Sequence, residues 1–538
     1  MRIPAAVVAF LAFLSPLTNA QNRGPRLAVI IVVDQMRGDY VDLFGKEWSG
    51  GLKRMSANGA RFANTAYPYL TTVTCAGHAT IATGALPRTH GIFQNAWFDR
   101  KSGASVTCTE DPRASDIGYA APVKAGDSAW RLERPTLADV MRSQRDARVV
   151  SLSLKDRSAI MLAGHGGDAV TWLSESLDGW VTSSVFSEKP VAAVKAFIDA
   201  NPIAADFKKT WSHSLPEASY KHGDDEAGEV PPRGWTKSFP HVLNGTSNTP
   251  DAAYYGQWER SPFADVYLAR FAAALVDAFA LGRRPQATDV LAISFSSPDL
   301  VGHAFGPRSQ EIEDLYAHLD QTIGTLFEHL DATVGRGSWV AALSADHGVT
   351  PIPEQLTAEG KDSGRLNSRV IGSLVEDKLR AAFGEGRYLA VPFGNDLYFM
   401  PGIYDRIRAS KPVMDGLLQT LRELPGIARV FRAEELRDPA SAQDDIQRAA
   451  ALSYFPGRSG DVILVPKPGW MFSASGTTHG SASPDDQRVP LMFLGAGVRP
   501  GKYNEPATPA DLAPTLAAIC GVRLGKVDGH ALTAALAH

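Results

Sequence analysis

The sequence predicts an α/β protein with a doubly wound, mostly parallel sheet flanked by helices. Three observations favour this class. Apolar, β-branched runs of strand length recur along the chain and end in polar residues, long helical stretches separate these runs, and 538 residues with 44% hydrophobic content suffice for a large core. Strands buried on both faces have this composition because helices cover both sides of a parallel sheet.

Four runs provide the centre of the predicted sheet, residues 27–34, 148–155, 289–299 and 339–346, and they end at Asp34, Lys155, Asp299 and Asp346. Two further runs, 460–466 and 489–495, are expected to complete it. Ligands of such sheets bind at the carboxyl ends of the strands. We therefore expect the charged residues at these strand ends to converge on one site.

Two insertions are predicted within a single catalytic domain that spans residues 21–538. Residues 205–260 are polar and rich in Pro, Gly and aromatic residues, which is typical of a surface excursion. Residues 351–454 mix helical segments with short strands, which indicates an inserted α+β cap that walls the site.

The N-terminus has the features of a secretory signal peptide over about residues 1–20. Arg2 precedes a short apolar stretch, and small residues precede Gln21. Because no other stretch approaches the roughly 20 apolar residues of a spanning helix, no stable membrane insertion is expected. The mature protein is predicted to be exported, and periplasmic in a Gram-negative source.

The charge and the cysteine content argue against a nucleic-acid binding protein and against a disulfide-built scaffold. The net charge of −4 gives no reason to expect a nucleic-acid partner, and no obligate protein partner is evident. Three cysteines are too few for a disulfide-built scaffold. Cys75 and Cys108 are the expected pair, because Cys520 lies in a run typical of a buried helix end.

A set of carboxylates and imidazoles indicates a metal centre. Asp299 and His303 are four residues apart, and therefore share a face if a helical turn follows the strand. The remaining members are Asp34, Asp346, His347 and His479. Taken singly, each Asp is more often a helix cap than a metal ligand, and each His is more often a core or surface residue. Together, six oxygen and nitrogen ligands suit two zinc ions with positions left open for substrate.

The segment "TTVTCAGHATIATG", residues 71–84, holds several hydroxyl groups at the start of a predicted helix. A threonine hydroxyl is a poor nucleophile at neutral pH, but a metal ion that binds its oxygen lowers its pKa. A bound metal would thus make Thr74 a nucleophile. The alternative is that Thr74 is a helix N-cap, a role compatible with anion binding at the same helix end. His78 is expected to orient this turn and not to bind metal.

Lys155 and Arg157 indicate an anion pocket. In an extended segment, residues two apart point the same way, and cations that end an apolar strand need an anion or acidic side chain opposite. An ammonium and a guanidinium suit the terminal oxygens of a phosphomonoester dianion, which a diester lacks.

The motifs "TCAGHATIATG", "HGIFQNAWFD", "KDR", "DLVGH", "ADHG" and "THGS" together resemble the alkaline phosphatase superfamily, specifically its threonine-dependent phosphomonoesterases that carry a Lys/Arg pocket. The resemblance runs from about Leu27 to the C-terminus and preserves the order of the motifs. Ala76 stands where family members usually have Pro.

The resemblance implies an alkaline phosphatase-like fold and a zinc-dependent phosphatase that acts on small phosphate monoesters through a covalent phosphothreonine. It makes Thr74 the nucleophile and Asn95 a ligand of a phosphoryl oxygen. One zinc would be held by Asp34, Asp346, His347 and Thr74, and the other by Asp299, His303 and His479. Lys155 and Arg157 would complete the phosphate site.

Three other functions stay open. A phosphodiesterase or nucleotide pyrophosphatase has the same metal core, although related diesterases lack the Lys/Arg pair. A sulfatase would need Pro and Arg at fixed spacing after its modified residue, whereas Ala76 and Gly77 follow Cys75. A non-catalytic exported metal or phosphate binding protein has no need of a separate cationic arm.

Overall fold

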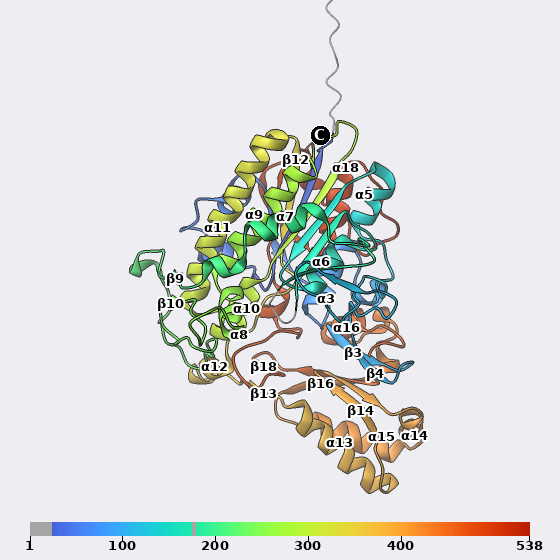
Figure 1. Ribbon diagram of the computed structural model, residues 1–538. Helices are drawn as coiled ribbons and strands as arrows, with labels where there is room; N and C mark the ends of the chain where they lie inside the picture. Colours follow the sequence, from blue (N-terminus) through green and yellow to red (C-terminus); the bar gives the residue numbers. More distant parts are fainter. Residues whose placement is uncertain (1–23, 175–178, 538) are drawn as a thin grey trace, which may run out of the picture.

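The computed structural model describes residues 24–174 and 179–537, so the predicted signal peptide lies outside the described residues. Its main sheet has ten strands (Figure 1), in the order β20 (Gly501–Ala507), β2 (Ala60–Thr65), β19 (Leu491–Gly495), β12 (Trp339–Ser344), β1 (Leu27–Val33), β11 (Asp289–Phe295), β6 (Val149–Ser153), β7 (Ala169–Leu173), β8 (Trp180–Ser183) and β5 (Asp116–Gly118). The neighbours from β12 to β7 are all parallel, with Ile31 level with both Ile293 and Leu343. The predicted α/β class is confirmed.

Alternate residues of β1 pack against different helix layers, which is why the strand is apolar throughout. Leu27, Val29 and Ile31 share a core with α9 (Pro262–Ala278) and α11 (Gln310–Leu330). Ala28 and Ile30 face the opposite core, which is built by α3 (Thr74–Thr83), α6 (Asp156–Ala163) and α18 (Leu512–Cys520). Successive side chains of a strand point to opposite faces, so both faces of the sheet are covered.

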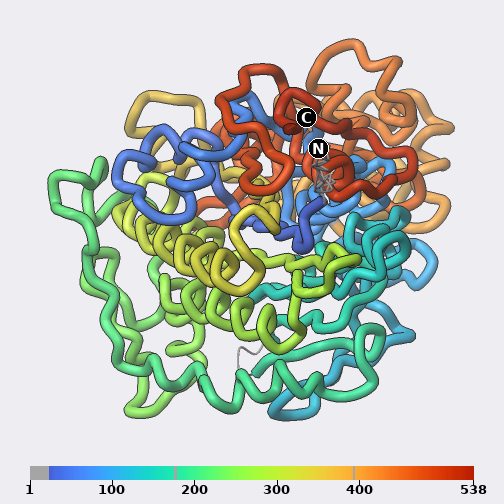
Figure 2. Tube along the Cα trace, turned by 90° about the horizontal axis from the view of Figure 1, so that it is seen from above, coloured from blue at the N-terminus to red at the C-terminus, as the bar shows by residue number. Residues whose placement is uncertain are grey.

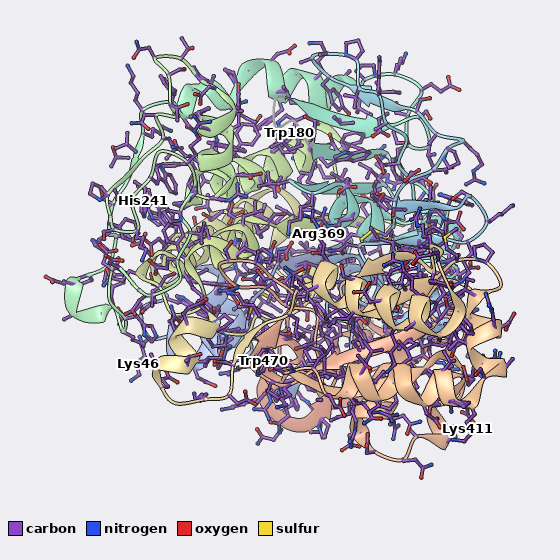
Figure 3. All side chains as sticks on the ribbon, turned by 90° about the horizontal axis from the view of Figure 1, so that it is seen from below. Lys46, Trp180, His241, Arg369, Lys411 and Trp470 are labelled. Carbon is purple, nitrogen blue, oxygen red and sulfur yellow. A yellow bond between two sulfur atoms is a disulfide. The ribbon has the colours of Figure 1, made fainter. Side chains whose placement is uncertain are left out.

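A smaller four-stranded sheet forms a lobe below the main sheet (Figure 1), in the order β14 (Leu389–Phe393), β15 (Asp396–Phe399), β17 (Val462–Pro466) and β16 (Ile427–Arg432). Seen from below, α13 (Ser368–Phe383) and α15 (Lys411–Arg422) cover its outer face, near the labelled Arg369 and Lys411 (Figure 3).

One strand prediction was wrong. The run 460–466 is β17 of the small sheet and not part of the main sheet. Val462 and Leu464 pack in one core of the lobe and Ile463 and Val465 in another. A strand buried on both faces reads as continuously apolar in either sheet, so its composition does not tell which sheet it joins. The run 489–495 does join the main sheet, as β19, antiparallel to β12 and β2.

The segment 205–260 runs outside α9 and α11 (Figures 1 and 2) and contains the short strands β9 (Thr210–Trp211) and β10 (His241–Val242), followed by α8 (Ala252–Glu259). It is not purely superficial, because Trp211, Tyr254 and Trp258 are fully buried. The division of the chain into a catalytic domain with insertions at 205–260 and 351–454 stays a prediction. Within the described ranges, no helix is both long and apolar enough to cross a membrane.

Candidate active site

Three carboxylates meet at the carboxyl edge of the main sheet. Asp34 follows β1 directly, Asp346 follows β12, and Asp299 lies in the first turn of α10 (Ser297–Phe305) after β11. All three are buried. Because β12, β1 and β11 are adjacent parallel strands, their ends bring these residues together, as the strand-end argument predicted. His303 lies one turn further along α10, with its Nε2 3.1 Å from Asp299 Oδ1.

One group of ligand atoms has the spacing of a zinc site. His347 Nε2 lies 3.4 Å from Asp346 Oδ2, 3.6 Å from Asp34 Oδ1 and 3.5 Å from Thr74 Oγ1. Ligands with bonds of 2.0–2.1 Å to a tetrahedral ion lie about 3.3–3.4 Å apart. Asp34 Oδ1 and Asp346 Oδ2 are buried and have no hydrogen-bond partner among the described residues; His78 Nδ1, which donates to Thr74 O, lies 3.3 Å from Asp346 Oδ2. These residues therefore fit a metal ion.

A second group of potential ligands lies beside the first and shares His347 with it. His479 Nε2 lies 3.7 Å from Asp299 Oδ1, and the rings of His347 and His479 stack with their centroids 3.4 Å apart. The compact triad of potential ligands on this side is Asp299, His347 and His479, whereas the resemblance assigned His303 in place of His347. All six predicted carboxylate and imidazole ligands are thus brought together, with His347 close to both groups.

Backbone carbonyls orient all three imidazoles in the same way. The Nδ1 atoms of His303, His347 and His479 donate to the carbonyls of Thr477, Gly348 and Thr72, at 2.8, 3.0 and 2.8 Å. Each neutral ring then presents the lone pair of Nε2 to a carboxylate oxygen, and two acceptors facing each other need a cation between them. Burial lowers the pKa of His347 and of His479, which favours this neutral, metal-binding form, whereas Asp299 outweighs burial at His303 and raises the pKa of that ring.

The candidate nucleophile begins a helix that packs against the candidate metal ligands. Thr74 is the first residue of α3 and Val73 is the N-cap, so the alternative interpretation, in which Thr74 itself caps the helix, does not hold. A Cβ on Gly77 would lie 2.1 Å from the carbonyl oxygen of Asp346, so only glycine allows this close approach. His78 holds the turn, with Nδ1 2.9 Å from Thr74 O and Nε2 2.9 Å from Ser294 Oγ.

Asn95 is tied to the same helix. Its Oδ1 accepts a hydrogen bond from the N–H of Cys75 at 2.9 Å, and its backbone carbonyl accepts one from Cys108. Cys75 and Cys108 form a disulfide, which confirms the predicted pairing, and Cys520 is free and buried. The bridge and Asn95 together join the start of α3 to the segment that follows β4 (Ala104–Thr107).

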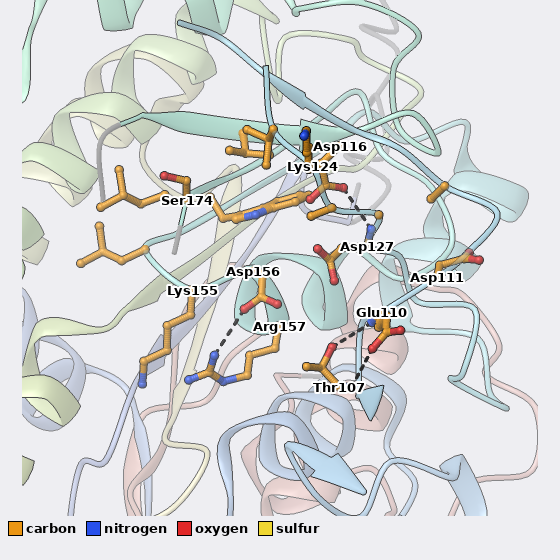
Figure 4. Close-up of a pocket in the computed structure, with 18 of the residues that line it drawn as sticks. Thr107, Glu110, Asp111, Asp116, Lys124, Asp127, Lys155, Asp156, Arg157 and Ser174 are labelled. Carbon is orange, nitrogen blue, oxygen red and sulfur yellow. Dashed lines mark hydrogen bonds and ion pairs between the residues drawn. The ribbon is translucent and has the colours of Figure 1, made fainter. Parts of the chain in front are cut away.

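Lys155 and Arg157 lie at the start of α6, at the edge of a pocket of about 880 Å³ (Figure 4). The expected extended geometry was wrong, because Arg157 is already in the first helical turn, yet both side chains extend in the same direction (Figure 4). Arg157 Nη1 contacts Asp156 Oδ1 at 3.3 Å, and its buried Nε has no partner among the described residues.

The acidic groups opposite Lys155 are the carboxylates of the candidate metal site. Lys155 Nζ lies 2.6 Å from Asp34 Oδ2 and 2.5 Å from Asp299 Oδ2. Burial opposes its charge, but Asp299 and Asp34 outweigh burial and raise its pKa. Burial, together with Asp299 and Asp346, raises the pKa of Asp34. One ammonium among three buried carboxylates leaves an excess of negative charge, which favours binding of further cations.

Gln35 was not predicted as a site residue, yet it donates hydrogen bonds to two of these carboxylates, Asp299 and Asp346. Its only signal was its position directly after Asp34. The outer pocket wall, which includes the carboxyl groups of Asp116 and Asp127, was not predicted either. These lie on short segments without a motif.

Comparison with known proteins identifies the family of this chain. Residues 28–485 match the family model described as type I phosphodiesterase / nucleotide pyrophosphatase. The chain is 31% identical over 529 residues to alkaline phosphatase PafA of Elizabethkingia meningoseptica, covering 94% of this chain and 93% of that protein. It is 32% identical over 523 residues to alkaline phosphatase PhoV of Synechococcus elongatus, covering 94% and 92%.

The fold agrees with these relationships. The crystal structure of wild-type alkaline phosphatase PafA superposes with a TM-score of 0.87 at 29% identity, over 96% of this chain and 100% of that one. The chain therefore belongs to the type I phosphodiesterase / nucleotide pyrophosphatase family, within the alkaline phosphatase superfamily that its motifs resemble.

Proposed function

We propose that the protein is an exported alkaline phosphatase that hydrolyses phosphate monoesters to inorganic phosphate, with two zinc ions and a covalent phosphothreonine at Thr74. The observation that carries the proposal is the convergence of Thr74 Oγ1, Asp34 Oδ1 and Asp346 Oδ2 around His347 Nε2. A hydroxyl in a metal-ligand group at a helix N-terminus is placed for nucleophilic attack on an anion. The named alkaline phosphatases among its relatives support the same reaction class.

The proposed reaction consists of two displacements. Thr74 Oγ1 attacks phosphorus, the P–O bond to the alcohol breaks, and the alcohol leaves with a proton. Water then attacks the phosphothreonine, which releases phosphate and restores the hydroxyl. Zinc, when bound, lowers the pKa of an oxygen it binds and neutralises charge on the phosphoryl group. Asn95, Lys155 and Arg157 would bind the remaining phosphoryl oxygens, where positioned charge contributes most.

A phosphodiesterase is the second candidate, because the matched family model is named for phosphodiesterases and nucleotide pyrophosphatases. Lys155 and Arg157 favour the monoesterase. A monoester dianion presents three terminal oxygens to these cations, whereas a diester presents two and carries one charge less.

The deciding experiment compares p-nitrophenyl phosphate with its methyl diester at alkaline pH in zinc. We expect wild type to prefer the monoester. The Lys155→Ala/Arg157→Ala variant should lose roughly 100–1,000-fold in monoester kcat/KM, as is typical for lost charge stabilisation, and little in diester activity. Lys195→Ala/Arg283→Ala, which removes two exposed cations remote from the site, is the matched control. A diester preference that the site variant leaves intact would make the protein a phosphodiesterase.

Covalent catalysis has its own readout. Acid quench of wild type during turnover should trap phosphate on the peptide that contains Thr74, detectable by mass spectrometry. Thr74→Ser should retain a trapped intermediate and Thr74→Ala should trap none. Turnover by Thr74→Ala close to that of wild type, in zinc-loaded protein, would remove Thr74 from the mechanism.

Export is the remaining part of the proposal, and it rests on the predicted signal peptide over residues 1–20. N-terminal sequencing of the protein from a periplasmic fraction should begin near Gln21. A retained Met1 would contradict it.

A further inference from the structure

Gln35 occupies an unusual backbone position between the two candidate metal groups. Its φ is +66°, in the left-handed region that non-glycine residues seldom adopt. Among the described residues, the other non-glycine positions with positive φ are Asp146, Lys208 and Ala280, none of which is buried, whereas Gln35 is 2% exposed. A buried side chain kept at such a position points to a task that its neighbours require.

Its two N–H groups reach one carboxylate of each metal group. The backbone N–H donates to Asp346 Oδ1 at 3.1 Å, and the side-chain Nε2 donates to Asp299 Oδ1 at 2.6 Å. Asp346 belongs to the group around Asp34 and His347, and Asp299 to the group around His479. The left-handed turn directs the two donors to different strands, since Asp346 follows β12 and Asp299 follows β11.

The oxygen of the Gln35 side-chain amide is also closely packed. A Cβ on Gly302 would lie 1.8 Å from Gln35 Oε1, so the glutamine fills the space that a larger residue would take on α10. With its oxygen against α10 and its nitrogen on Asp299, the amide cannot rotate freely. The carboxylate of Asp299 is thereby fixed relative to the residues of β1.

We infer that Gln35 is a positioning residue that holds the carboxylates of the two metal groups at a fixed separation. As a neutral donor it orients both acids without competing for the cation, unlike Lys155, whose charge does compete. Hydrogen-bond partners of metal ligands typically change metal affinity by 10–100-fold when replaced. The inference rests on the proposed two-metal site and adds a residue outside its ligand set.

The test is zinc binding and needs no substrate. Gln35→Met keeps the side-chain size and the backbone N–H but loses the donor to Asp299. Titration of the zinc-loaded protein with a chelator should show two ions leaving wild type. In the variant, the ion on the Asp299 side should leave at a 10–100-fold lower concentration of free chelator. The ion on the Asp346 side should be retained as in wild type.

Two further variants separate positioning from folding. Gln35→Gly adopts the left-handed turn without strain and should show the same one-site loss, even if Gln35→Met folds poorly. Gln257→Met is the matched control, because Gln257 is a buried glutamine bonded to Gly245 and Arg233, away from the metal groups. It should bind both ions as wild type does.

The outcomes distinguish a failure of the role of Gln35 from a failure of the proposed two-metal site. If wild type binds two ions and Gln35→Gly releases both as wild type does, the role of Gln35 is overturned while the metal site stands. Equal weakening of both ions in Gln35→Gly would also overturn it, because only the donor to Asp299 is lost. If wild type binds no zinc, the proposed function and the role of Gln35 both fail.

Discussion

Two largely buried groups of acidic and imidazole side chains differ in what they are arranged to hold. The site group consists of the six predicted carboxylate and imidazole ligands at the edge of the main sheet, namely Asp34, Asp299, His303, Asp346, His347 and His479. The second, here called the peripheral group, consists of Glu229, His241 and Glu311, where segment 205–260 meets α11. Both contain buried carboxylate oxygens without a hydrogen-bond partner among the described residues.

The difference lies in how the imidazoles are oriented. In the site group, every Nδ1 is bonded to a carbonyl and every Nε2 faces carboxylate oxygens. In the peripheral group, His241 Nε2 lies 2.9 Å from Glu311 Oε1, and its Nδ1 has no hydrogen-bond partner within residues 24–174 and 179–537. Burial raises the pKa of Glu229 and of Glu311 to about 8, so these acids hold protons at neutral pH. Burial of acids alone therefore does not make a metal site; oriented lone pairs do.

The largest effect should come from removing metal. Exhaustive chelation should lower activity by roughly 1,000-fold or more, because metal ions supply several kcal/mol of charge stabilisation. The melting temperature should also fall, since three carboxylates then face Lys155 alone. Activity and zinc content, followed together, check this, and zinc should restore both. Full activity in protein without detectable metal would place catalysis outside the site group.

Matched histidine variants test the comparison directly. His479→Asn should lose one of two zinc ions. It should lower activity by more than the roughly 100-fold expected when only a hydrogen-bond partner of a metal ligand is replaced. His241→Asn should leave zinc content and activity unchanged. Metal analysis of both proteins is the measurement. Loss of zinc from His241→Asn would show that the peripheral group also binds metal.

Replacing Lys155, the cation that contacts the site group, should lower the free energy of unfolding most when no metal is bound. Lys155→Met removes the ammonium that contacts Asp34 and Asp299 and should destabilise the metal-free protein by roughly 3–5 kcal/mol, the usual cost of breaking a buried ion pair. With zinc bound, the loss should be smaller. Arg157→Met, which breaks a partly exposed contact, should cost about 0–1 kcal/mol in either form. Equal destabilisation of the two forms by Lys155→Met would mean that the lysine does not substitute for metal charge.

The sequence predicted what local patterns determine. Apolar runs identified β1, β6, β11 and β12, and the four-residue spacing placed His303 beside Asp299. It did not predict that β17 joins the small sheet, because a doubly buried strand has the same composition in either sheet. Gln35 and the backbone carbonyls that orient the imidazoles escaped because their roles depend on contacts between distant segments. Thr72 and His479 illustrate this, since 407 residues separate them in the chain.

The smallest effect, and the one specific to the peripheral group, concerns stability against pH. The pKa of Glu229 is raised to about 8 by burial and by Glu311, so its contribution is fully present below the ordinary value near 4.5 and is lost as pH rises to about 8. Glu229→Gln removes this titration. Its stability advantage over wild type should therefore grow between pH 5 and pH 8, by at most about 1.4 kcal/mol per pH unit, and stay constant above.

Thermal melts of wild type, Glu229→Gln and the exposed control Glu217→Gln at pH 5.5, 7 and 9 check this prediction. Because the proposed phosphatase works at alkaline pH, it would operate where Glu229 destabilises the fold most, and the advantage of Glu229→Gln should be largest there. An advantage that is independent of pH would mean that Glu229 is already ionised across the range. The peripheral group would then carry buried negative charge, and its difference from the site group would lie in geometry alone.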